Sequence, residues 1–281
     1  MNDILEIKAL EKEYKEFKLG PVSINIPKGY IVGFIGENGS GKSTTIKAIL
    51  GLIHYDNGIV KIFGKEIAEE IKELGDDIGV VLDDINLPSD LKIFEVGKMC
   101  SKIFKNWNQK TYDMYSDKFQ LSKKKKVKEL SRGMKMKLSL SIALSHDARF
   151  LILDEPTSGL DPIVREEILD ILLDFVQDEN KSVFISSHIL SDLEKVADYI
   201  AFIHKGKIIF YENKDELYEK YVLYLCGKDE TPYIDEKAIV GKTSNEFGKK
   251  FLLLREFAPE NLDYEKPNIE DIMLFYVKGD K

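Results

Sequence analysis

Gly36-Glu37-Asn38-Gly39-Ser40-Gly41-Lys42-Ser43 is the stretch that decides the fold of this 281-residue chain. It fits the pattern G-x-x-x-x-G-K-[ST], a loop that cradles the phosphates of ATP or GTP. Residues 30–35 before it form an apolar run typical of a buried strand. Residues 44–53 after it show the apolar spacing of a helix. The chain therefore has the strand, loop and helix that this motif requires, which an ordinary glycine-rich turn would not explain.

The residue types in this loop suit phosphate chemistry. Glycines let the backbone wrap closely and direct N–H groups at phosphate oxygens, and the following helix adds its dipole. Lys42 is expected to reach the β- and γ-phosphates, and the Ser43 hydroxyl is expected to bind Mg²⁺. The residues expected to bind nucleotide here are Gly36, Asn38, Gly39, Ser40, Gly41, Lys42, Ser43 and Thr44.

The composition indicates a soluble globular protein with a heavily charged surface, at 43% hydrophobic and 32% charged residues. A net charge of -8 argues against a dedicated nucleic-acid binder, despite the basic run at 123–126. Cys100 and Cys226 suggest neither a disulfide framework nor a metal site, and are expected to be thiols in a reducing cytosol. Neither a signal peptide nor a membrane span is expected, so a role in transport would require another chain to supply the pore.

The order of strand and helix patterns predicts an α/β fold with a P-loop NTPase core. Apolar runs at 78–82, 150–153, 183–185 and 200–203, alternating with helical patterns, predict a mainly parallel sheet covered on both faces. Alternating patterns near the N-terminus predict an antiparallel β part. We expect an ATP-binding domain over residues 1–215 with a helical subdomain at about 87–145. Residues 216–281 are expected to form a small accessory α+β segment, with a strand at 251–254 and a final helix capped by Asn268.

Two acids end one of the apolar strands. Asp154 is expected to hold Mg²⁺, directly or through its waters. Glu155 is placed to polarise a water molecule for attack on the γ-phosphate, as a general base. Taken alone, the two acids could equally begin a loop, and the phosphate loop would leave kinases, GTPases and ATPases open.

The next segment, Pro156-Thr157-Ser158-Gly159-Leu160-Asp161-Pro162, narrows the choice. With it, the sequence resembles the ATP-binding subunit of ABC transporters. That family has a signature loop upstream of the acidic strand, where this chain has Leu130-Ser131-Arg132-Gly133-Met134. It also has a histidine after the next strand, which Ser186-Ser187-His188 supplies. The resemblance covers about residues 3–215, with the motifs in the family's order.

The resemblance implies a role for each matching residue. Tyr14 would stack on adenine, with Phe17 as the second choice, and His188 would contact the γ-phosphate and hold the attacking geometry. Ser158 and Asp161 would lie in a loop at the dimer interface. The signature loop would sit at a helix N-terminus that caps the γ-phosphate of ATP held by a second subunit. The signature residues are Ser131, Arg132, Gly133 and Met134.

Two positions depart from the commonest family pattern. Arg132 stands where the signature loop usually has a second glycine, and Met134 where it usually has glutamine. The resulting Leu-Ser-x-Gly-Met form resembles a subgroup of exporters for antibiotics and amphipathic peptides. Asp83 stands where the family usually has a glutamine that contacts Mg²⁺ and senses the membrane partner. Asp83 is therefore a candidate Mg²⁺ ligand, or, with Asp84, only the start of a solvated loop.

Together these features predict the ATPase subunit of an ABC transporter, at the cytoplasmic face of the plasma membrane, with ATP and Mg²⁺ as cofactors. It would dimerise with a second copy or a related subunit and power a separate transmembrane permease. Export of a peptide, an antibiotic or another amphipathic compound is favoured. The helical insertion and the loop after Asp83 would form the docking face for the permease.

Three alternatives stay open at this level. A soluble member of the same superfamily, acting in translation or DNA repair, is disfavoured by the single ATPase module and the net acidity. A regulatory module that binds ATP without hydrolysing it is disfavoured because both Glu155 and His188 are present. A P-loop kinase would leave the signature and Ser-Gly-Leu-Asp segments unexplained.

Overall fold

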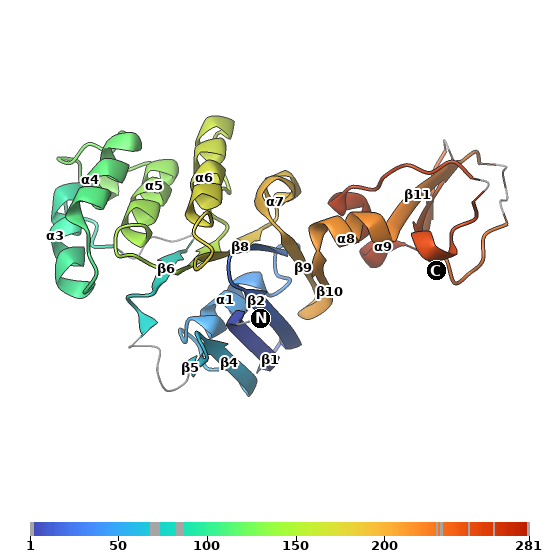
Figure 1. Cartoon of the computed structure of the whole chain (residues 1–281), viewed down its shortest axis with the longest axis horizontal. Helices are drawn as coiled ribbons and strands as arrows, with labels where there is room; N and C mark the ends of the chain where they lie inside the picture. Colours follow the sequence, from blue (N-terminus) through green and yellow to red (C-terminus); the bar gives the residue numbers. More distant parts are fainter. Residues whose placement is uncertain are drawn as a thin grey trace.

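A six-stranded sheet forms the centre of the molecule (Figure 1). The computed structural model describes residues 3–67, 74–82, 87–228, 230, 233–246, 248–260 and 262–279. The order β10-β9-β3-β8-β7-β6 is parallel except for β10, which runs antiparallel to β9. These strands are β3 (Ile31–Ile35), β6 (Ile78–Val81), β7 (Phe150–Asp154), β8 (Ser182–Ser187), β9 (Tyr199–His204) and β10 (Lys207–Asn213). The mainly parallel sheet predicted from the apolar runs is confirmed.

Both faces of this sheet are buried, which explains why its strands are apolar without alternation. Successive residues of β3 belong to different cores: Ile31 and Ile35 to one, Val32 and Phe34 to the other. The first core is covered by α5 (Arg132–Ala143), α6 (Pro162–Phe175) and α7 (Leu190–Val196). The second is covered by α1 (Lys42–Ile49) and by a separate antiparallel sheet, so helices and sheet enclose the central layer (Figure 1).

The antiparallel β part predicted near the N-terminus is confirmed. It has the order β2-β1-β4-β5. Its strands are β1 (Asp3–Glu13), β2 (Lys18–Pro27), β4 (Asn57–Ile62) and β5 (Lys65–Glu66). Leu5 and Ile7 alternate along β1, and Leu10 follows a shift in the strand register; all three are fully buried against the central layer, as a sheet with one covered face requires.

The helix after the phosphate loop is shorter than the periodicity over 44–53 suggests. It begins at Lys42 and ends at Ile49, because Gly51 adopts a left-handed conformation with φ 63°. The Leu52 N–H then donates to the Lys47 carbonyl oxygen at 2.8 Å, closing the turn. This is the Schellman arrangement by which glycine ends a helix.

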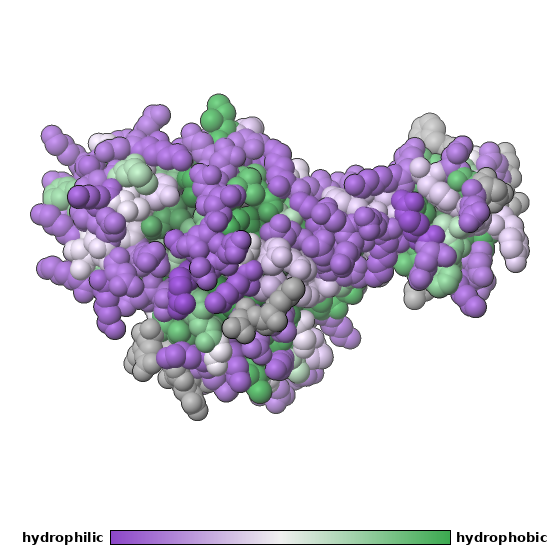
Figure 2. Space-filling view, in the orientation of Figure 1, coloured by the Kyte–Doolittle hydropathy of each residue, from purple (hydrophilic) through white to green (hydrophobic). Residues whose placement is uncertain are grey.

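The helical insertion is also confirmed. It contains α3 (Ile93–Ile103), α4 (Gln109–Lys118), the 3₁₀ turn η1 (Val127–Glu129) and α5. The buried Tyr112 of α4 joins it to α3, since its hydroxyl donates to the Ile93 carbonyl oxygen at 2.7 Å. Among the described residues, no helix has the length and apolarity needed to cross a membrane. Figure 2, drawn in the same orientation as Figure 1, shows that most of the surface on this face is hydrophilic.

The C-terminal segment projects from the β9–β10 side of the core (Figure 1). Its sheet has the order β11-β13-β12 and packs against the last helix. The elements are α8 (Lys214–Lys220), β11 (Tyr221–Cys226), β12 (Ile239–Ser244), β13 (Lys249–Leu254), η2 (Arg255–Phe257) and α9 (Ile269–Lys278). The predicted cap is present, because the Asn268 side chain accepts from the Asp271 N–H at 2.7 Å. Neither β11, β12 nor α8 was predicted from the sequence.

Candidate functional site

The phosphate loop connects β3 to α1 and is tightly folded. Lys42 donates from Nζ to the carbonyl oxygens of Gly36 at 2.7 Å and Glu37 at 3.3 Å. Gly36 has no room for a side chain, since a Cβ there would lie 2.4 Å from Ser40 Oγ and 2.5 Å from the Ile203 carbonyl oxygen. No side chain caps the N-terminus of α1, and Gly41 before it has φ 113°. The loop therefore presents a helix N-terminus and a buried cation to any anion bound there.

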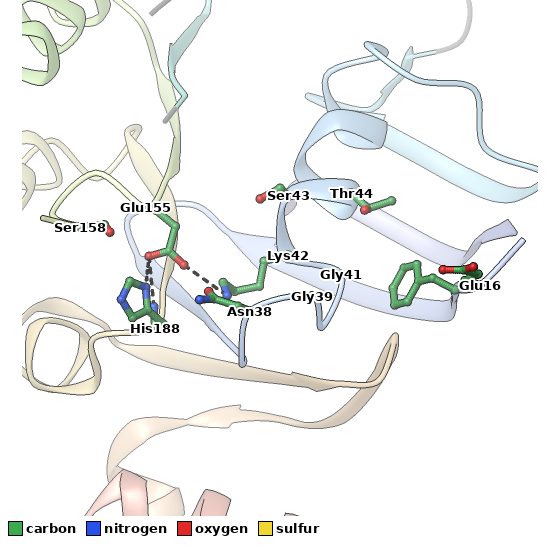
Figure 3. Close-up of a pocket in the computed structure, with 11 residues that line it drawn as sticks. Glu16, Asn38, Gly39, Gly41, Lys42, Ser43, Thr44, Glu155, Ser158 and His188 are labelled. Carbon is green, nitrogen blue, oxygen red and sulfur yellow. Dashed lines mark hydrogen bonds and ion pairs between the residues drawn. The ribbon is translucent and has the colours of Figure 1, made fainter. Parts of the chain in front are cut away.

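A cavity of about 800 Å³ opens over this loop. Figure 3 shows the phosphate loop on one side of it and Glu155, Ser158 and His188 on the other. The residues that line it are Glu16, Phe17, Asn38, Gly39, Gly41, Lys42, Ser43, Thr44, Glu155, Ser158 and His188. Most of the residues predicted to bind nucleotide are therefore brought together, with Gly36 and Ser40 in the loop that forms the floor.

Glu155 connects the lysine and the histidine (Figure 3). Its Oε1 lies 3.2 Å from Lys42 Nζ, and its Oε2 lies 2.6 Å from His188 Nδ1. The backbone of Glu155 has φ 52°, a conformation that costs a non-glycine residue about 1–3 kcal/mol. Its N–H donates to Ser186 Oγ at 3.1 Å, so β8 supports this backbone. A residue held in an unfavourable conformation at a cavity mouth is typical of a catalytic position.

Asp154 immediately precedes Glu155 in the sequence and is buried. Its Oδ1 accepts a hydrogen bond from Ser186 Oγ at 2.6 Å. Ser43 lines the cavity at the start of α1. A serine hydroxyl and a carboxylate are the oxygen ligands that Mg²⁺ prefers, so this pair fits the predicted metal role. Asp83, the third candidate ligand, lies outside the described residues.

Some buried polar atoms near the cavity have no hydrogen-bond partner among the described residues. One is Ser40 Oγ in the phosphate loop, and another is Thr157 Oγ1 in the segment that follows Glu155. Unsatisfied buried oxygens of this kind are rare in folded proteins and call for an explanation such as a bound ion, water or ligand. Ser40 lies just before the uncapped N-terminus of α1, where a nucleotide with its metal and waters would supply such a partner.

Phe17, and not Tyr14, forms part of the cavity wall. Tyr14 is 45% exposed, and Lys12 Nζ lies 5.6 Å from its ring centroid. The two aromatics belong to the turn between β1 and β2, where the Tyr14 N–H donates to the Phe17 carbonyl oxygen at 2.8 Å. A sequence contains no signal for which side of such a turn faces the phosphate loop. Glu16 also lines the cavity and was not among the predicted residues.

The signature loop lies outside this cavity, at the start of α5. Ser131 caps the helix, accepting from the Met134 N–H at 3.3 Å. The Arg132 guanidinium packs on Gly159, where an added Cβ would lie 3.1 Å from Nη1. Asp161 caps α6 by accepting from the Val164 N–H at 3.1 Å. The signature loop therefore contacts the 158–161 turn of its own chain and does not reach the cavity on the same protomer.

A second, apolar cavity of about 340 Å³ lies between the helical insertion and β6. His146 forms part of its wall and is buried, with its ring stacked on Phe104 at a centroid distance of 4.1 Å. Burial lowers the pKa of His146, and its hydrogen-bonded contacts with the Ile142 and Ile78 carbonyl oxygens oppose that effect. The lining residues are Leu50, Leu52, Gly75, Ile78, Val80, Leu82, Phe104, Ile142, Ala143 and His146.

Comparisons with known proteins agree with this architecture. A family model described as ABC transporter matches residues 19–158. The lantibiotic transport ATP-binding protein of Streptococcus pyogenes is 36% identical over 231 residues, which cover 79% of this chain and 98% of that protein. The bacitracin transport ATP-binding protein of Enterococcus faecalis is 32% identical over 225 residues, covering 78% and 72%. A solved ATP-binding subunit of an ABC transporter superposes with a TM-score of 0.67 at 26% identity, covering 76% of this chain and 91% of that one.

Proposed function

The chain belongs to the ABC transporter family and is an ATPase subunit, and we propose that it powers a separate membrane protein that exports a peptide antibiotic or a similar amphipathic compound. One observation carries the assignment of ATPase activity: the Glu155 carboxylate is held between Lys42 and His188 over the phosphate loop. The cargo class rests on the relatives that transport a lantibiotic and bacitracin, together with the Leu-Ser-x-Gly-Met signature.

Several residues in and beside the cavity would have defined parts in hydrolysis. Lys42 would exchange its ion pair with Glu155 for the β- and γ-phosphates of ATP. The freed carboxylate of Glu155 would accept a proton from the attacking water, and His188 would hold that carboxylate and the γ-phosphate in line. Ser43 and Asp154 would hold Mg²⁺, which when bound neutralises charge on the phosphate oxygens. Positioning and charge stabilisation would supply most of the rate enhancement, as in phosphoryl transfer generally.

Phe17 is our choice for the aromatic residue that stacks on adenine. Its ring lines the phosphate cavity, and its Cζ would lie 3.1 Å from a Cβ on Gly41, so it is adjacent to the loop. Tyr14, the residue favoured from the sequence, would have to reorient from its exposed position to reach the same nucleotide.

Two ATP-binding subunits would close around two nucleotides. In one protomer the Ser131 end of α5 is exposed and does not face the phosphate cavity. A second subunit would bring its own Ser131 and Gly133 to the γ-phosphate, where a helix N-terminus favours an anion. Ser158 and Asp161 would lie along the same interface. The pair would be two copies of this chain or one copy with a related subunit.

The apolar cavity beside β6 is proposed as the docking point for the transmembrane permease, which would place the subunit at the cytoplasmic face of the plasma membrane. Leu52 lines this cavity and is 58% exposed, and the wall is formed by both the helical insertion and the central sheet. A permease segment seated there would contact both the helical insertion and the central sheet.

The test is an affinity purification of tagged Glu155→Gln protein from detergent-solubilised host membranes with Mg-ATP. We expect a stoichiometric multi-span membrane protein, because a subunit that binds but does not hydrolyse ATP should stay in the closed state. Glu179→Gln, an exposed acid far along the chain, is the matched control and should behave as wild type. Leu52→Glu should lose the membrane protein if docking uses the apolar cavity. Recovery of ribosomes or DNA-repair proteins without a membrane partner would favour the soluble alternative.

A further inference from the structure

A buried ion pair joins the two helices that follow the catalytic segments. Arg165 on α6 donates from Nη2 to Oδ1 of Asp192 on α7. The side chain of Asp192 is 2% exposed and that of Arg165 is 26% exposed. Within the described residues, the second oxygen of Asp192 is buried without a hydrogen-bond partner. The Asp192 carboxylate is therefore nearly removed from water, while Arg165 is partly exposed, so this pair is more buried than most ion pairs on the surface.

The two helices start where the cavity wall ends. α6 begins at Pro162, directly after the turn that contains Ser158, and α7 begins at Leu190, two residues after His188. Ser158 and His188 both line the phosphate cavity. Figure 1 shows α6 and α7 side by side over the β8 region of the sheet. A contact between these helices is thus placed to affect the spacing between the two loops that lead into them.

A stabilising role alone does not account for a charge pair at this place. Burying two charges costs desolvation, and apolar residues of similar volume often give equal or greater stability. Apolar residues already pack in this core from both helices, among them Ile168, Leu169, Leu193 and Val196. An ion pair adds a directional contact that favours one arrangement of the two helices. α7 has seven residues and no side-chain cap at its N-terminus, and the ion pair adds this directional contact to its apolar packing.

We propose that Arg165 and Asp192 are positioning residues for ATP hydrolysis. Their ion pair holds α7 in the rotation that keeps His188 Nδ1 at 2.6 Å from Glu155 Oε2. Without it, α7 shifts against α6 and His188 leaves the line between the carboxylate and the γ-phosphate. This inference rests on the proposed roles of Glu155 and His188.

The chain supplies a matched control on the same two helices. Lys195 on α7 forms an ion pair with Glu166 on α6, next in sequence to Arg165. Its side chains are 52% and 54% exposed, so water screens the pair and its loss should matter little. Comparing the buried pair with the exposed one separates the effect of geometry from that of any charge contact between α6 and α7.

The experiment measures steady-state ATPase activity and thermal unfolding of the purified full chain at several protein concentrations. Asp192→Asn and Arg165→Lys are expected to lower kcat by about 10- to 100-fold, the loss that a displacement of about 1 Å produces. KM for Mg-ATP should stay within about twofold, because the phosphate loop is untouched. Glu166→Gln should leave both constants unchanged. In a His188→Ala background, Asp192→Asn should cause little further loss, since both changes remove the same function.

Specific outcomes would overturn the inference. Normal kcat in both Asp192→Asn and Arg165→Lys would do so. So would a full, additive loss of kcat when Asp192→Asn is placed on His188→Ala. If Asp192→Asn does not fold, Arg165→Lys decides, because it keeps a cation against Asp192 and loses only the planar guanidinium. If Glu155→Gln hydrolyses ATP at the normal rate, the proposed function of Glu155 as the base is refuted. That result is distinguishable from a failure of the inference about Arg165 and Asp192, which is tested by their own variants.

Discussion

Replacing Lys42 by methionine is the sharpest test of the phosphate site. Lys42 is 5% exposed and lies at the first turn of α1, with Nζ near Gly36, Glu37 and Glu155. Methionine keeps most of the length and the apolar stem of the side chain but removes the charge. The variant should therefore keep the packing of α1 and lose the contact with phosphate.

The size of the effect follows from the partners of Nζ. An ammonium group has three donors, and two of them are directed at the carbonyl oxygens of Gly36 and Glu37. The third direction, held by Glu155 at 3.2 Å, is the one a phosphate oxygen can take over. A hydrogen bond to a charged group contributes about 1.5–3 kcal/mol. Its loss should raise the Kd for Mg-ATP by about 10- to 150-fold. The unpaired Glu155 carboxylate acts in the same direction, because it repels phosphate.

Isothermal titration calorimetry with Mg-ATP gives the Kd directly, and thermal unfolding shows whether the variant is folded. Lys47→Met is the matched control, because Lys47 is exposed in the last turn of the same helix. It should bind Mg-ATP as the wild type does. A folded Lys42→Met protein with a Kd within about twofold of the wild-type value would refute the assignment of the phosphate loop.

Two further predictions concern stability. Burial lowers the pKa of His146, so its neutral form stabilises the fold above the unfolded pKa near 6.5, and this stabilisation is lost as pH falls through the lower folded value. His146→Phe should therefore show a smaller drop in melting temperature between about pH 7.5 and 5.5 than the wild type, and an equal drop would contradict this. Asn268→Ala should lower the free energy of unfolding by about 1 kcal/mol, measured by urea titration, because it removes the cap of α9. An unchanged urea midpoint would show that the cap contributes nothing.

Local features of the fold were predictable because they depend on neighbouring residues. The phosphate loop needs glycines where the backbone turns or where there is no room for a side chain, and Gly36 meets the second condition. The apolar runs of the central strands indicate that both faces of the sheet are buried, and Asn268 indicates where α9 begins. The end of α1 was predictable in principle from Gly51, but the apolar periodicity continued beyond it and suggested a longer helix.

Which aromatic lines the phosphate cavity was not predictable in the same way. Tyr14 and Phe17 are both aromatic, and both belong to the turn between β1 and β2. The geometry of that turn places the Phe17 ring on the cavity wall and leaves Tyr14 exposed. The strands β11 and β12 were also missed, because they depend on pairing with β13 more than on their own patterns.

The sequence by itself determined which residue types stand at the end of each strand: the lysine after β3, the acids after β7 and the histidine after β8. Only the tertiary structure decided that these ends meet, because β8 pairs in parallel with both β3 and β7 and all carboxyl ends point the same way. The same holds for Arg165 and Asp192, which share no motif and become partners only when α6 packs against α7. Motifs encode chemistry along the chain, while distances between distant residues come from strand order and helix packing.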